Sequence, residues 1–216
     1  MKPLKSPKPG DLFYIPALNS SDETGFVIAR YIELIPPALG HLVEVFAKFY
    51  TQIPVSMSEV DTSKRRCRPI YCSMLFTEIP RWKILFSDPN YKKVSSGYDE
   101  IQFAFESEIW VGGVSKPATE QQLNNIEPSI CWRMHHIIFR VIAHLRGALS
   151  DAEPMDYEKL PPDLRIDSTI ASERVNKAAL SAQALFAAHK KWAPNPVGVP
   201  IFLPTRLPSD GPALTG

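Results

Sequence analysis

Prolines divide this chain into short segments and so limit what each segment can form. The chain has 216 residues, of which 21 are prolines, about twice the average usage. Pro36-Pro37, Pro80 and Pro161-Pro162 interrupt apolar runs, because proline has no backbone N–H with which to continue a strand ladder or a helix. Six more prolines fall within residues 194–216. This C-terminal segment is therefore expected to be an extended strap or tail rather than a helix.

The first half of the chain alternates between apolar and polar residues with the period of two that is typical of strands. In residues 41–50, Val43 and Val45 share one face, while Glu44 and Lys48 share the other. The same alternation recurs at 100–106. Further strands are expected at 11–17, which follows a Pro-Gly turn, at 25–35, which is rich in β-branched residues, and in the apolar runs 69–78 and 82–87. They predict a strongly bent antiparallel β-sheet or a small barrel.

The pattern changes near residue 114 to one typical of helices. Residues 130–149 place Arg133, His136, Arg140 and His144 at helical spacing on an otherwise apolar segment, which predicts a largely buried helix with one polar stripe. A second long helix is expected at 168–191, with Ser168 or Ser172 as its N-cap. The fold class predicted is therefore α+β.

Three regions follow from these patterns. Residues 1–113 are expected to form the antiparallel β domain, residues 114–193 a helical extension packed on it, and residues 194–216 the Pro-rich tail. Extended Pro-rich arms often reach beyond their own domain. The tail is therefore a candidate contact for a homo-oligomer.

Net charge and cysteine content restrict the class of protein. The formal net charge is +1, and both halves of the chain are close to neutral, which argues against a dedicated nucleic-acid binder. Neither an N-terminal secretion signal nor an apolar run long enough to cross a membrane is evident. The three cysteines form an odd number, which fits reduced thiols and a cytoplasmic location better than a disulfide framework.

The motifs that usually accompany catalysis or metal binding are missing from the sequence. There is no HExxH, no CxxC, no calcium loop and no glycine-rich phosphate loop, and the Gly-x-Ser-x-Gly nucleophile motif is also absent. His135 and His136 would point about 100° apart on a helix, and His136 and His144 would lie two turns apart. The sequence therefore predicts neither a metal site, nor a cofactor, nor an enzyme.

Two groups of charged residues are candidates for binding a partner. Lys64, Arg65, Arg66 and Arg68 fall within five residues between two expected strands, where a loop of this kind can dock a phosphate or an acidic protein surface. Its alternative is an ordinary solvated loop. The second group consists of outward-facing carboxylates at Glu100, Glu106 and Glu108.

Several residues of the N-terminal half together form a distinctive pattern. It consists of a Pro-Gly-Asp turn, a strand with Phe and Ile-Pro, a Gly-aromatic pair, a strand with an arginine, and a later Trp-Val-Gly-Gly. The residues that carry it are Gly10, Asp11, Phe13, Pro16, Gly25, Arg30 and Trp110. This pattern resembles the immunity protein 26 family of bacterial polymorphic-toxin systems, over about residues 8–113. The resemblance implies a non-catalytic protein that binds and neutralises a cognate toxin.

Elementary geometry accounts for parts of this pattern. Gly10 permits a tight turn, and Asp11 can cap that turn through its side chain. Gly25 is expected to let the second strand begin close to the first.

The same Pro-Gly-Asp start also resembles the MazF-like growth-inhibitor ribonucleases, in which a barrel cleaves RNA. That resemblance would make Arg30 the catalytic cation. The loop before the second strand departs from the ribonuclease pattern, because it is Ser20-Ser21-Asp22-Glu23-Thr24. A nucleic-acid-associated scaffold module is the remaining alternative.

Overall fold

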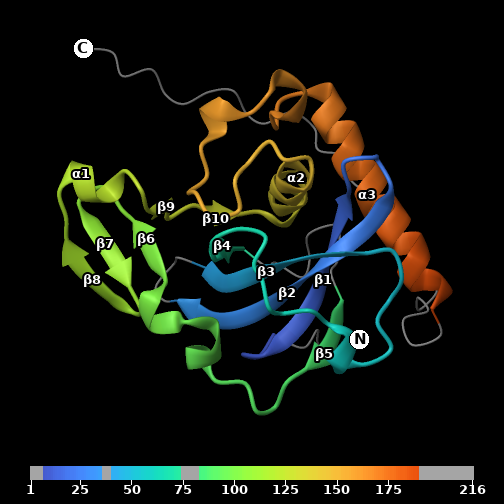
Figure 1. Cartoon of the computed structure of the whole chain (residues 1–216), viewed down its shortest axis with the longest axis horizontal. Helices are drawn as coiled ribbons and strands as arrows, with labels where there is room; N and C mark the ends of the chain where they lie inside the picture. Colours follow the sequence, from blue (N-terminus) through green and yellow to red (C-terminus); the bar gives the residue numbers. More distant parts are fainter. Residues whose placement is uncertain (1–6, 36–39, 74–82, 190–216) are drawn as a thin grey trace.

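The larger of two β-sheets forms the centre of the molecule. The structure, a computed structural model, describes residues 7–35, 40–73 and 83–189. Six strands follow one another across the large sheet in the order β10-β4-β3-β2-β1-β5 (Figure 1). They are β1 (Asp11–Leu18), β2 (Thr24–Ile35), β3 (Gly40–Tyr50), β4 (Ile70–Cys72), β5 (Ile84–Ser87) and β10 (Cys131–Trp132). The antiparallel pairing expected from the sequence is confirmed for β1 to β5.

The large sheet is bent, as predicted. The register between β2 and β3 shifts twice, between Val27 and Ala29 and between Tyr31 and Glu33, and such bulges bend a strand and increase its twist. Of the segment 69–78 expected as a strand, only β4 forms one among the described residues, and 74–82 lies outside them.

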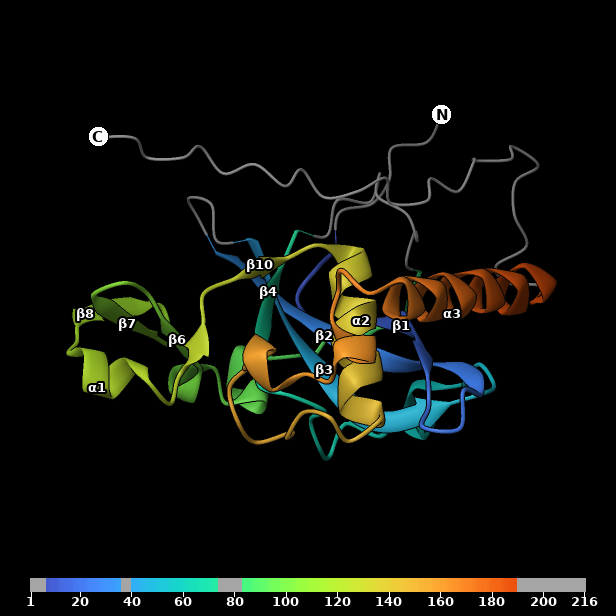
Figure 2. The ribbon, with the colours of Figure 1, turned by 90° about the horizontal axis from the view of Figure 1, so that it is seen from above.

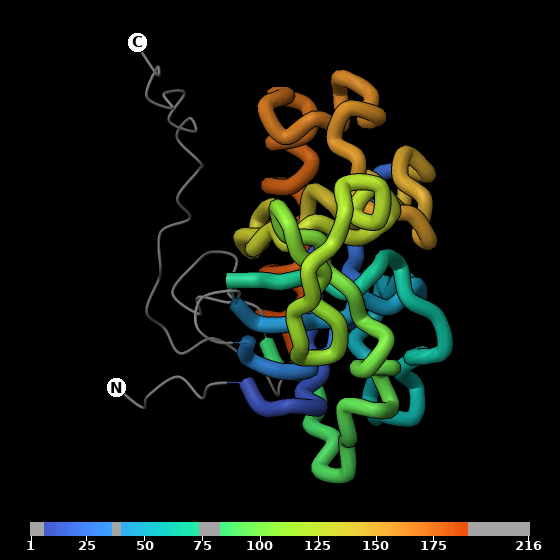
Figure 3. The backbone as a smooth tube through the Cα atoms, turned by 90° about the vertical axis from the view of Figure 1, so that its left-hand side faces the viewer, coloured from blue at the N-terminus to red at the C-terminus, as the bar shows by residue number. Residues whose placement is uncertain are grey.

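A second, smaller sheet has the strand order β8-β7-β6-β9. Its strands are β6 (Gln102–Ala104), β7 (Glu108–Val111), β8 (Val114–Pro117) and β9 (Glu127–Pro128), and a short helix α1 (Glu120–Leu123) follows β8. The small sheet lies at one end of the molecule (Figures 1 and 2). In Figure 3 it faces the viewer, in front of the large sheet.

Residues 127–132 connect the two sheets. β9 pairs in parallel with β6, and β10 pairs in parallel with β4. The sequence was expected to be helical from residue 130, and this expectation is wrong because the segment meets two sheet edges. Unpaired backbone groups at such an edge accept a further strand, as in the hydrogen bond from Ser73 N to Trp132 O at 2.9 Å. The segment 114–132 thus contributes strands to both sheets before the first of the two longer helices begins at residue 134.

Two longer helices, α2 (Met134–Leu145) and α3 (Thr169–Ala188), pack against the large sheet. Ser168 caps α3 by accepting a hydrogen bond from Ala171 N, which confirms the predicted N-cap. Single 3₁₀ turns occur at Met57–Glu59 (η1), Lys93–Ser96 (η2), Tyr98–Glu100 (η3), Tyr157–Lys159 (η4) and Pro162–Leu164 (η5). Among the described residues, the helices are too short or too polar to cross a lipid bilayer.

The core consists of three clusters that all include strands of the large sheet. One lies between β1–β3 and the helices, and includes Phe13. A second joins Tyr14 and Phe26 to Phe186 of α3. β5 pairs with residues 11–13 of β1, and α3 packs against β1. Beyond the end of that pairing, Tyr14 is therefore covered by α3. The third lies between the two sheets and includes Trp110.

The turn before β1 is built as the sequence predicts. Gly10 has φ of 89°, and a Cβ there would lie 2.6 Å from Asp88 O, so only glycine fits. The Asp11 carboxylate accepts hydrogen bonds from Lys8 N at 2.8 Å and from Ser87 Oγ at 2.6 Å. Asp11 therefore caps the turn and also ties it to β5.

The role predicted for Gly25 is different in the structure. A Cβ at Gly25 would lie 2.3 Å from Tyr50 O, so the close approach is to β3 rather than to β1. Pro16 lies in β1 opposite Phe26.

The α+β fold class predicted from the sequence is confirmed. The Pro-rich tail at 194–216, and with it the proposed oligomer contact, lies outside the described residues.

Candidate functional site

The small sheet has one face in the core and one face toward solvent. Phe103 pairs with Trp110 across β6 and β7, and both side chains are buried in the cluster between the sheets. Successive side chains of a strand point to opposite faces. The neighbouring pairs, Gln102 with Val111 and Ala104 with Ile109, therefore point away from the core.

β8 extends this solvent-facing surface. Val114 pairs with Val111 and Lys116 pairs with Ile109, so both extend the same face. Val114 is 58% exposed, and all four residues of β8 are exposed. We call this surface the outer face, and its apolar residues are Ala104, Ile109, Val111 and Val114. Contiguous exposed apolar side chains on a soluble protein commonly mark an interaction surface.

The small sheet is also the acidic end of the chain. Residues 98–126 contain five carboxylates and a single lysine, Lys116, which is a formal charge of −4. Because the whole chain carries +1, the remainder carries +5. A division of the sequence at residue 113 hides this asymmetry, since it cuts the β7–β8 hairpin and leaves two nearly neutral halves.

The three glutamates predicted to bind a partner all lie at the surface of this acidic end. Glu106 is in the turn between β6 and β7, and Glu108 is the first residue of β7. Glu100 precedes β6, at the opposite end of the hairpin. The structure thus places Glu106 and Glu108 near each other at one end of the hairpin, with Glu108 on the strand face of Trp110 rather than on the outer face, and it places Glu100 at the other end.

The arginines of the 64–68 loop make contacts within the protein. Arg65 Nε donates to Glu44 Oε2 at 2.8 Å, and Arg68 donates to the carbonyls of Ala152 at 2.9 Å and Asn125 at 2.6 Å. The simple picture of a solvated loop is therefore wrong for these side chains. Arg68 connects three segments that are distant in the sequence, and no pattern in the sequence indicates those carbonyl partners.

Arg66 also makes contacts within the protein, whereas the side chain of Lys64 is mostly exposed. Arg66 donates to the Ala47 carbonyl and to Asp151 Oδ2, the latter at 3.4 Å. The Lys64 side chain is 72% exposed. Lys64 is therefore the cation of this run that is most accessible to an external ligand.

Arg30 belongs to a buried polar network rather than to an open surface. Its guanidinium lies 2.9 Å from Glu44 Oε1, and its Cζ lies 5.1 Å from the ring centroids of Phe46 and Tyr91. Ser96 Oγ donates to the same carboxylate at 2.6 Å. This guanidinium is committed to an internal ion pair, which does not favour the catalytic role implied by the ribonuclease resemblance.

The polar stripe predicted on the first long helix lies on α2, and its residue Arg140 is buried against β9 of the small sheet. Arg140 and Glu127 are each 1% exposed and form an ion pair of 2.5 Å between Nη1 and Oε1. Met155 N donates to the second oxygen of Glu127 at 3.2 Å. Burial raises the pKa of the nearby Cys67 to about 11, so this thiol stays protonated. The stripe therefore anchors β9 and the 152–155 segment to α2.

An open depression of about 500 Å³ lies next to this buried pair. It is bordered by the 64–66 segment, by His144 of α2 and by residues 147–152. The Asp151 carboxylate lies 3.6 Å from Lys64 Nζ, 3.4 Å from Arg66 Nη1 and 3.3 Å from His144 Nδ1. Neither ring nitrogen of His144 makes a hydrogen bond of normal geometry to the described residues.

Protonation of His144 is expected to destabilise the fold. Burial, with Arg140 and Arg66 nearby, lowers the pKa of His144 to about 3, against an ordinary value of 6.5. Between these values the unfolded chain binds a proton that the folded protein does not bind, so stability falls as the pH falls. The loss approaches about 1.4 kcal/mol per pH unit below pH 6.

Urea unfolding at pH 7, 6 and 5 measures this loss. The variant His144→Asn should show a shallower decrease than the wild type. His136→Asn should also show a shallower decrease, because burial lowers the pKa of His136 to about 4, and the variant that lacks both histidines should show the shallowest decrease of all. An identical pH dependence in wild type and His144→Asn would contradict the assignment.

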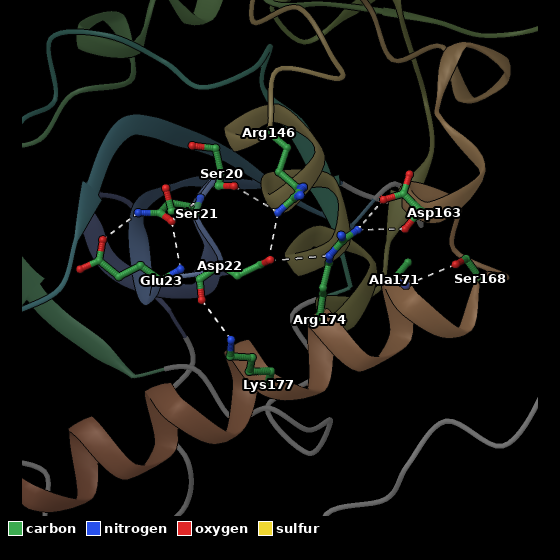
Figure 4. A network of polar contacts seen from close by, with 11 residues as sticks. Ser20, Ser21, Asp22, Glu23, Arg146, Asp163, Ser168, Ala171, Arg174 and Lys177 are labelled. Atoms are coloured by element: carbon green, nitrogen blue, oxygen red, sulfur yellow. Dashed lines mark hydrogen bonds and ion pairs between the residues drawn. The ribbon is translucent and has the colours of Figure 1, made fainter.

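A second basic cluster holds the turn between β1 and β2 (Figure 4). Arg146 at the end of α2 donates to Asp22 Oδ1 at 3.0 Å, and Lys177 of α3 donates to the Asp22 carbonyl at 3.1 Å. Arg174 lies 3.8 Å from the same carboxylate and binds Asp163 Oδ2 at 2.9 Å. This network ties the hairpin to both helices, which makes it a structural clamp.

Comparison of the chain with known protein families, with functionally characterised proteins and with solved structures finds no match. Within residues 7–35, 40–73 and 83–189, no group of three histidine, cysteine or acidic side chains is arranged to hold a metal ion. Two candidate binding surfaces therefore remain: the outer face with its acidic surroundings, and the basic depression.

Proposed function

We propose that this chain is a non-catalytic protein-binding module, an immunity-type protein that neutralises a cognate toxin in the cytoplasm by direct binding. The observation that carries the proposal is the outer face, an apolar surface on an exposed edge of a sheet that bears a formal charge of −4. Val114 of this face is exposed, and Ala104, Ile109 and Val111 are half-buried, so the protein itself covers the face only in part. An interface with a partner would cover the remainder.

The charge of the small sheet indicates the kind of surface that it would meet. A partner with a basic surface would be drawn toward Glu106 and Glu108, because complementary charge mainly speeds association and selects the partner. A stable complex buries about 800 Å² on each side. The outer face would supply the apolar centre and the two glutamates part of the polar rim.

A charge-reversal experiment tests this proposal. The double variant Glu106→Lys/Glu108→Lys should slow association with the cognate toxin domain that the proposal requires by about tenfold at low salt. Val114→Asp should speed dissociation, because it places a charge in the apolar centre. Surface plasmon resonance measures both rates.

Glu173→Lys is the matched control, because Glu173 is an exposed glutamate of α3, outside the small sheet. Equal binding by the small-sheet variants and the control would contradict the outer face as the binding surface. RNA cleavage by the chain that disappears in Arg30→Ala would instead support the ribonuclease alternative. Salt-dependent DNA binding would support the scaffold alternative.

Charge reversal at Arg65, Arg66 or Arg68 is a less informative test than the sequence suggested. Each of these side chains makes hydrogen bonds within the protein, so its loss would disturb the fold together with any interface. Their role in binding a partner stays a prediction.

A further inference from the structure

The depression between the 64–66 segment and the 147–152 loop contains more donors than its single carboxylate can satisfy. Asp151 lies 3.3 to 3.6 Å from a nitrogen of each of three side chains, Lys64, Arg66 and His144. Charge-assisted hydrogen bonds are usually about 2.7–2.9 Å long. The planar carboxylate therefore bridges the three groups and saturates none of them.

His144 is the second sign that this cluster is incomplete. Its side chain is 1% exposed and lines the depression. The ring is held only loosely, by Asp151 Oδ1 at 3.3 Å from Nδ1 and by the Leu149 backbone, and neither ring nitrogen makes a hydrogen bond of normal geometry to the described residues. A neutral imidazole always carries one N–H donor. Buried donors without an acceptor are rare in native proteins because they are costly, so an acceptor from outside the described chain would fit here.

We propose that this depression binds a phosphate monoester, with Lys64, Arg66 and His144 as donors and with Asp151 as the group that the phosphate displaces. A tetrahedral phosphate presents three terminal oxygens, one for each donor, whereas a carboxylate presents two. The space of about 500 Å³ beside the cluster lies within the range of small-ligand sites. This inference does not depend on the proposed toxin-binding role of the small sheet.

The loop that carries Asp151 is anchored on both sides of this residue. Ala148 N donates to the Ala143 carbonyl at 3.0 Å, and Arg68 donates to the Ala152 carbonyl at 2.9 Å. The displacement proposed is therefore a rotation of the Asp151 side chain rather than a movement of the loop. Asp151 itself is held only by the three long contacts described above among the side-chain contacts of the described residues.

The surrounding charges favour a dianion over the singly charged phosphodiester of nucleic acids. With Asp151 displaced, the depression presents the two cations Lys64 and Arg66, whereas the charge of Arg140 is already paired with Glu127. The two cations form a positive field. A monoester at neutral pH carries nearly two negative charges, so it compensates this field better than a diester does. The expected ligand is therefore a terminal phosphate, on a phosphorylated side chain or on a small metabolite.

The test is a titration of the full chain with inorganic phosphate, followed by NMR of the histidine side chains, with chloride at equal ionic strength as the reference. Asp151→Asn removes the competing carboxylate and should tighten phosphate binding by about tenfold. Adding Lys64→Ala to that variant should weaken it again by a similar factor. Asp22→Asn is the matched control, because it removes the carboxylate of the other basic cluster.

The outcomes distinguish the two sources of the phosphate from each other, and both of them from failure of the proposal. Tighter binding of a phosphoserine peptide than of inorganic phosphate would indicate a phosphorylated protein, and tighter binding of a nucleoside monophosphate would indicate a metabolite. A dinucleotide should bind more weakly than either. The proposal is overturned if Asp151→Asn shows no saturable shift of the His144 resonances, or if Asp22→Asn responds equally.

Discussion

Replacing Arg140 with methionine is expected to destabilise the folded protein by about 3–5 kcal/mol, because it leaves the Glu127 carboxylate buried without its counter-charge. Both side chains are 1% exposed, and the pair joins α2 to β9, the edge strand of the small sheet. Urea unfolding followed by circular dichroism measures the change in the free energy of unfolding.

The double variant Arg140→Met/Glu127→Leu is the control for this result. Apolar residues of similar size often replace a buried ion pair with little loss, so the double variant should recover most of the stability that the single variant loses. A single variant that unfolds within about 1 kcal/mol of the wild type would contradict a dry, buried pair.

Truncation of Phe186 to alanine is expected to cost about 3–5 kcal/mol, the range for removing a buried aromatic ring. Phe186 is 2% exposed. Its ring stacks on Tyr14 with centroids 3.8 Å apart and lies 5.5 Å from the ring of Phe26. The change would leave a cavity where α3 packs beside β1, and thermal unfolding measures it.

Leu180→Ala on the same helix supplies the comparison. Leu180 is 49% exposed, and surface substitutions of this kind usually change stability by less than about 0.5 kcal/mol. Equal destabilisation by the two variants would mean that Phe186 does not hold α3 to the sheet.

Local patterns in the sequence predicted much of the fold. Period-two alternation found β3, a preceding Pro-Gly turn found β1, and β-branched residues found β2, while the Ser168 cap marked the start of α3. Gly10 and Asp11 occupy the tight turn for the reasons that their chemistry suggests. These features were predictable because each depends on residues a few positions apart, where backbone sterics and side-chain hydrogen bonds decide the conformation.

The candidate site was only partly predictable, because it depends on residues that lie far apart in the sequence. Glu106 and Glu108 were found as exposed carboxylates, but the apolar outer face requires the β6–β7–β8 register. The basic depression brings Lys64 to His144 and Asp151 across about eighty residues of chain. Such contacts follow from packing, which no local pattern records.

The sequence by itself determined strands β1 to β3, the Ser168 cap of α3, the tight turn at Gly10 and the overall balance of charge. Only the tertiary structure decided that residues 127–132 join two sheets, that Arg140 is buried on Glu127, and that Lys64, Arg66 and His144 surround Asp151. The physical reason is the separation along the chain of the residues that interact. Backbone conformation responds to neighbours along the chain, whereas burial and charge pairing depend on which distant segments share the same space.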